Sequence, residues 1–102
     1  MTIINEANYG EKTYIVSIAT GLAWTYPYQV AAYNEQDAVD LVADYMEANG
    51  HSGFYYERFE LELMAKHSEW QTVEAFTEAH NFTCCGNHGI YIILANIEEV
   101  QI

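Results

Sequence analysis

The 102-residue chain has very few cationic side chains. Three Lys or Arg residues oppose fifteen Asp or Glu residues, which gives a formal net charge of -12 at pH 7. Affinity for nucleic acid depends on Lys and Arg side chains that neutralise phosphates, and anionic membrane surfaces attract proteins through the same cations. The composition therefore argues against direct binding to nucleic acid or to such a membrane surface. It favours a basic partner, including a protein that itself handles nucleic acid.

Long apolar runs and a basic leader are missing as well. No stretch approaches the ~20 apolar residues that a membrane-spanning helix needs. The first residues, MTIINEANYG, lack the basic start and apolar core of a signal peptide. We therefore expect a cytoplasmic protein. Its two cysteines are then expected to be reduced thiols, because the cytosol keeps thiols reduced.

Aromatic and apolar residues, in contrast, are plentiful. Apolar residues make up 51 % of the chain, which includes nine Tyr, four Phe and two Trp. Disordered acidic segments have few aromatic residues, so this composition indicates a folded protein. The length suits one domain, and we expect a single domain over residues 1–102.

The pattern of apolar residues predicts an α+β domain with the order β-β-α-β-α-β. Strands are expected over residues 12–19, 26–33, 54–65 and 90–97. One helix is expected from the cap Asn34 to Asn49, and a second from Ser68 or Thr72 to about His80. We expect about four mostly antiparallel strands with both helices packed on one face. Residues 90–97 are apolar on both faces, which predicts a central strand covered on both sides or a strand at an interface.

The first predicted helix carries a row of carboxylates. Asp37, Asp40, Asp44 and Glu47 are three, four and three residues apart, so they share one helical face over roughly 15 Å. These four residues are called the acidic row below. Like charges at these spacings destabilise a helix by a few tenths of a kcal/mol per pair, and this helix has no Lys or Arg to offset them. The row is therefore a candidate surface for a cationic partner; the alternative is a solvated face that keeps the protein soluble.

Two further acids are expected to extend this surface. Glu60 and Glu62 lie on the polar face of the predicted strand over residues 54–65. Acid–base catalysis needs carboxyl groups that converge in a pocket, and a row along an outer helical face does not converge. We therefore expect a protein that is not an enzyme and that needs no cofactor.

The stretch NFTCCGNHGI, residues 81–90, is the sharpest chemical feature of the chain. A thiol or metal site would recruit His80, Cys84, Cys85 and His88, since thiolate and imidazole suit zinc or copper. The adjacent cysteines do not match the Cys-x2-Cys spacing of structural zinc sites. We favour a turn between the second helix and the last strand, in which Asn81 ends the helix in a left-handed conformation.

No family motif is present in the chain. In size and charge it is similar to small acidic accessory proteins of phages and conjugative elements in bacteria, which include inhibitors that imitate nucleic acid. This similarity is one of composition, and it carries no functional residue. The leading expectation is an acidic interaction protein that binds a basic protein, as an inhibitor or nucleic-acid mimic of a phage or mobile element. The alternatives are a small thiol or metal-binding protein that uses Cys84 and Cys85, and a structural accessory that self-associates as a homo-oligomer.

Overall fold

The computed structural model describes the backbone of residues 1–20, 23–24 and 26–100. These residues form an α+β domain, as predicted, with more elements than the sequence indicated. The strands are β1 (Thr2–Ile3), β2 (Lys12–Thr20), β3 (Ala23–Trp24), β4 (Tyr28–Ala32), β5 (Tyr56–Glu57), β6 (Thr83–His88) and β7 (Tyr91–Glu99). The helices are α1 (Glu35–Ala48), α2 (Arg58–Lys66) and α3 (Val73–His80). None of the helices in this part of the chain has the length and apolar character needed to cross a bilayer.

Strand β7 lies at the centre of the sheet. The strand order is β1-β4-β2-β7-β5, while β3 pairs with β2 and β6 pairs with β7. Ala95 of β7 lies opposite Ile18 of β2 and also opposite Thr83 of β6, so these two strands flank β7 on its two edges. The pairing is antiparallel except between β1 and β4. The prediction of a mostly antiparallel sheet is confirmed.

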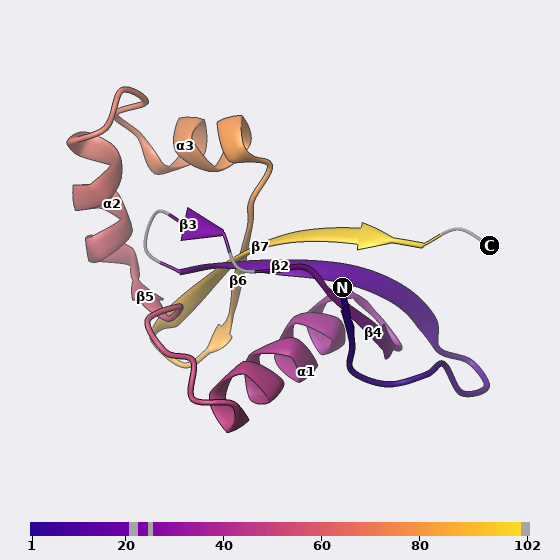
Figure 1. The fold of residues 1–102 in the computed structure, drawn as a ribbon. Coiled ribbons are helices and arrows are strands. Elements are labelled where there is room, and N and C mark those ends of the chain that lie inside the picture. The colour runs from indigo at the N-terminus through magenta and orange to yellow at the C-terminus, as the bar shows by residue number, and fades with distance from the viewer. Residues whose placement is uncertain (21–22, 25, 101–102) are drawn as a thin grey trace.

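The helices cover both faces of the sheet, and the prediction of two helices on one face is wrong. Helix α1 lies on one side of the strands, and α2 and α3 lie on the other (Figure 1). Ile93 and Ala95 of β7 belong to the apolar cluster that contains the buried side of α1. Leu94, between them, belongs to the cluster under α2 and α3. This alternation explains why the sequence of β7 is apolar on both faces.

The prediction of a strand over residues 54–65 is also wrong, because α2 begins at Arg58. The segment RFELELMAK alternates between apolar and polar residues, but it also consists largely of strong helix formers. Leu61 and Ala65 are buried four residues apart, with Met64 partly buried beside them. This helical spacing lets α2 pack on the sheet, whereas Phe59 stays 63 % exposed.

The stretch at residues 81–90 is a strand where a turn was predicted. Residues Thr83–His88 form β6, which pairs with β7 so that Cys85 lies opposite Ile93. The register shifts between Cys85 and His88, so the irregularity in the strand falls at Gly86 and Asn87. Asn81 does end α3 in the left-handed conformation, with φ 56°, as predicted. The N-cap of this helix is Thr72, whose side chain accepts a hydrogen bond from the backbone N–H of Ala75.

We expect replacement of Leu94 by Ala to destabilise the protein by about 2–5 kcal/mol, since it leaves a cavity beneath α2 and α3. Glu98→Ala, on an exposed part of the same strand, should change stability by less than about 0.5 kcal/mol. Urea unfolding followed by circular dichroism measures both variants. A cost for Leu94→Ala no larger than that for Glu98→Ala would show that α2 and α3 do not pack on this face.

Candidate functional site

The acidic row lies on the side of α1 that points away from the sheet. The buried side of this helix consists of Ala38, Val39, Val42, Ala43 and Met46. In the row, Asp44 and Glu47 are exposed, and Asp37 and Asp40 are partly exposed. The last turn of α1 contains no basic residue. The structure thus brings these four carboxylates together on one accessible helical face, as the spacing predicted.

Local hydrogen bonds fix the start of this helix. The backbone N–H of Asp37 donates to Oδ1 of Asn34 over 2.8 Å, and the backbone N–H of Tyr33 donates to Oδ2 of Asp37 over 3.3 Å. The two side chains therefore cap the helix in the manner of a capping box. Asp40 accepts a hydrogen bond from the side chain of Gln36 over 3.1 Å. Asp37 therefore stabilises the helix start, whereas Asp44 and Glu47 extend the row towards the other end.

Tyr55 lies beside the C-terminal half of the row. Its hydroxyl interacts with the carboxylate of Glu47, and its ring lies 6.2 Å from the ring of Tyr91, centroid to centroid. Burial, together with this interaction and the nearby carboxylates, raises the pKa of Tyr55 to about 12. The hydroxyl therefore stays protonated at neutral pH beside the Glu47 carboxylate. Tyr91 is 42 % exposed, so aromatic surface borders the carboxylates.

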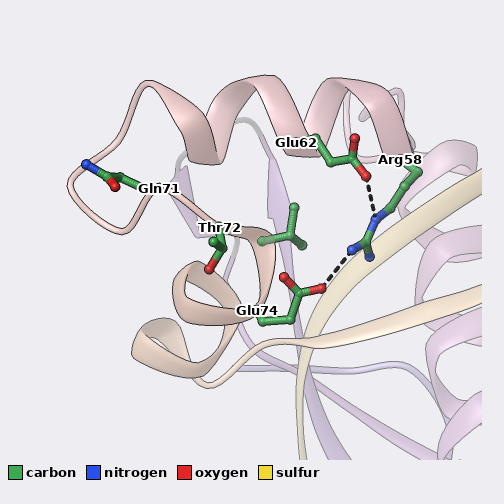
Figure 2. A pocket seen from close by; sticks show the side chains of 6 residues that line it. Arg58, Glu62, Gln71, Thr72 and Glu74 are labelled. Carbon is green, nitrogen blue, oxygen red and sulfur yellow. Dashed lines mark hydrogen bonds and ion pairs between the residues drawn. The ribbon is translucent and has the colours of Figure 1, made fainter.

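Glu60 and Glu62 do not extend the acidic row. Both lie on α2, which covers the opposite face of the sheet from α1. Oε1 of Glu62 lies 3.3 Å from Nε of Arg58, and Nη2 of the same guanidinium lies 2.8 Å from Oε1 of Glu74. Figure 2 shows Arg58 reaching from α2 to the carboxylate on α3. This ion-pair group borders a cavity of about 210 Å³, which Gln71 and Thr72 also line.

Two of the three Lys and Arg side chains, Lys12 and Arg58, form ion pairs with carboxylates outside the acidic row. The hydrogen bonds that Arg58 donates to Glu74, and then to Glu62, raise the pKa of its guanidinium. Because two carboxylates surround this one guanidinium, the small cavity beside it offers no uncompensated positive charge to an anion. Lys12 lies 3.4 Å from Glu99. Among the described residues, the ion pairs thus use Glu62, Glu74 and Glu99 rather than Asp44 or Glu47.

The described members of the candidate thiol and metal set, His80, Cys84 and Cys85, are not gathered around one point. Cys84 and Cys85 are free cysteines on opposite faces of β6. Cys85 packs in the cluster under α1, whereas the charges of Arg58 and Glu74 act on the pKa of Cys84. Nδ1 of His80 lies 3.0 Å from the backbone oxygen of Phe76. The side chain of His88 lies outside what the structure describes. In the described part of the chain, no three His, Cys, Asp or Glu residues are placed to share a metal ion.

Both thiols are held in their protonated form. Burial, helped by nearby negative charges that include Asp40, raises the pKa of Cys85 to about 11. Cys84 is on an exposed edge strand, yet its thiol is packed closely enough that burial raises its pKa, against the opposing effect of Arg58. Nucleophilic and metal-binding cysteines need the thiolate, which a lowered pKa favours. The surroundings of these two thiols therefore favour packing over chemistry.

Sequence reasoning missed the aromatic border of the acidic row. Tyr55 reaches Glu47 because the chain turns back after α1 through Gly50 and Gly53, which adopt φ values of 81° and 85°. Glycine tolerates such left-handed conformations without steric cost. Two glycines close to a helix end were the available signal for this reversal, but they did not indicate which tyrosine would lie against the helix.

No family model matches the chain, and neither the curated proteins nor the solved structures include a significant match to it. The chemistry of the described residues therefore carries the functional inference.

We expect the two cysteines of the folded protein to react with iodoacetamide at different rates. At pH 8, a thiol with a pKa near 11 is about 200-fold less ionised than an ordinary cysteine, so Cys85 should be modified only when the protein unfolds. Cys84 should react first, although more slowly than a free thiol. Mass spectrometry of the Cys84→Ser and Cys85→Ser variants assigns each rate. Modification of Cys85 as fast as Cys84 in folded protein would contradict the assigned burial.

Proposed function

We propose that this chain is a non-enzymatic interaction protein that binds a basic partner through the acidic face of α1. This acidic face consists of the acidic row and the bordering Tyr55. The observation that carries the proposal is the position of Asp44 and Glu47, which are exposed on a helix without a basic residue. A tyrosine beside a carboxylate suits an arginine side chain, which combines an ion pair with stacking on an aromatic ring.

The energetics of α1 support a role in binding rather than in stability. Neighbouring carboxylates in the row repel each other by a few tenths of a kcal/mol per pair. Glu47 is in the last turn, where the helix dipole disfavours an anion. A cationic partner would relieve both effects when it docks. Docking of an external positive charge would therefore gain a modest electrostatic free energy, because it removes this repulsion.

The spacing of the row suits a site made for one nucleic-acid strand. Its four carboxylates span roughly 15 Å, or ~5 Å per charge. One strand of a DNA duplex carries a phosphate every ~3.4 Å along the helix axis. The charge densities differ by a factor of about 1.5, so the acidic face can occupy a cationic groove that holds a phosphate backbone. The finer form of the proposal is therefore an inhibitor that imitates nucleic acid towards a nucleic-acid-handling protein.

The placement of the carboxylates and of the two thiols favours a binding function over catalysis. The carboxylates of the row lie along a convex helical surface, whereas acid–base chemistry needs groups that converge on one substrate atom. The alternative of a thiol or metal site at Cys84 and Cys85 has weaker support, since the two thiols lie on opposite faces of β6 and their pKa values are raised.

A double replacement of Asp44 by Asn and Glu47 by Gln tests the acidic face. It removes two charges, keeps the side-chain shapes, and leaves the capping residue Asp37 in place. We expect affinity for an arginine nonapeptide, measured by fluorescence anisotropy at low salt, to fall about three- to tenfold. We also expect unchanged or slightly higher stability, and a shallower dependence of affinity on salt.

The matched control is the double variant Glu69→Gln and Glu78→Gln. Both residues are exposed and lie on the α3 side of the sheet, so this variant changes the net charge equally but spares α1. Its affinity for the peptide should stay within about twofold of the wild-type value. Equal losses for the two double variants would mean that net charge alone attracts the peptide, and the proposed face would be wrong.

A further inference from the structure

A second cavity lies between α2 and α3, on the opposite side of the sheet from the acidic face. Its volume is about 400 Å³, which is within the range of small-molecule sites, ~300–1,000 Å³. Four rings line it from the α3 side: Trp70, Phe76, His80 and Phe82. The end of α2 and the residues after it contribute Met64, His67 and Ser68. The packing of α2 against α3 leaves this space unfilled.

The four rings form one continuous aromatic group. His80 and Phe82 are stacked, with an interplanar angle of 8° and centroids 5.4 Å apart. The ring of Trp70 meets that of His80 edge to face at 4.7 Å and that of Phe76 at 5.6 Å. Aromatic pairs gain ~0.5–1.5 kcal/mol beyond the burial of their surface. A flat aromatic ligand therefore gains more against these rings than an aliphatic ligand of equal area.

The described polar side chains that line the cavity are those of His67, Ser68, Trp70 and His80. The hydroxyl of Ser68 donates to the backbone oxygen of Ala65 over 2.6 Å. Nδ1 of His80 faces the backbone oxygen of Phe76, and because a carbonyl oxygen only accepts, this nitrogen carries the proton. In neutral His80, Nε2 is then the ring nitrogen left to accept a hydrogen bond. Among the described residues, no Asp, Glu, Lys or Arg lines the cavity, so its wall offers no carboxylate, ammonium or guanidinium group to a charged ligand.

We propose that this cavity binds a small uncharged aromatic molecule of one or two fused rings that donates a hydrogen bond to Nε2 of His80. The volume sets the size, the aromatic wall selects a flat ring, and the lack of charged lining residues selects a neutral one. The site is independent of the acidic face.

Indole and benzothiophene provide a matched pair of probes. The two molecules have similar shapes, but benzothiophene carries sulfur in place of the N–H donor. We expect indole to bind saturably and to shift the NMR signals of the Met64 methyl group and the Trp70 ring. Benzothiophene should bind at the same place about three- to tenfold more weakly, as expected for the loss of one hydrogen bond. In a His80→Phe variant the two affinities should become equal, since a phenyl ring preserves the aromatic wall and accepts no such bond.

A cavity-filling variant locates the site. Met64→Trp should abolish the binding of both probes, whereas the control Leu63→Trp adds the same ring to the same helix at a partly exposed position and should bind normally. Circular dichroism confirms that each variant is folded, and the shifts in wild-type protein decide the location if Met64→Trp does not fold. Absence of saturable indole binding to the wild-type protein would overturn the proposal. So would binding that survives in folded Met64→Trp, or tighter binding of tetramethylammonium than of indole.

Discussion

The burial of β7 on both faces is the constraint on which the rest of the structure depends. Ile93 and Leu94 are adjacent, have no exposed surface, and point into different apolar clusters. A polar side chain at either position would lose its hydration without gaining a partner, which costs about 1–3 kcal/mol in proteins. Since β2 and β6 also occupy the two edges of β7, this one strand sets where both helical layers can pack. The acidic face and the aromatic cavity are on opposite sides of the sheet for that reason.

The packing of α1 explains how the protein tolerates its row of like charges. The helix buries Val39, Val42 and Met46 completely, and each fully buried side chain of this size contributes about 1.5–3 kcal/mol. Repulsion within the row is smaller, a few tenths of a kcal/mol per pair. Core packing therefore decides whether the helix forms, and apart from the cap at Asp37 stability neither requires the row nor forbids it. A surface under so little structural constraint is open to selection by a partner or by solubility. Selection by a partner depends on where the charges lie on the surface, whereas selection for solubility depends only on their number.

The sequence predicted those elements for which independent local signals agree. For α1, the cap at Asn34, the apolar stripe and the Asn49–Gly50 end all indicated the same helix. For α2, alternation indicated a strand while propensity indicated a helix, and burial of Leu61 on the sheet decided between them. Strand β6 depends on pairing with β7, which no local pattern reveals. The acidic row was predictable because spacing within a helix fixes a shared face. The contact between Tyr55 and Glu47 was not, because it depends on how the chain turns back after α1.

The two helical layers differ in how completely they are packed, and this separates the two proposed binding events. The layer under α1 is one continuous cluster that reaches from β4 to β6. The layer under α2 and α3 is smaller, and Met64, Trp70 and Phe82 are only partly buried in it. Regions with fewer buried contacts open at lower free energy than the core. A ligand in the aromatic cavity would therefore stabilise the α2–α3 layer in particular, whereas a basic partner would dock on a helix that is packed on the larger cluster. Because the two sites lie on opposite faces of the sheet and share no side chain, the two events should add with little coupling.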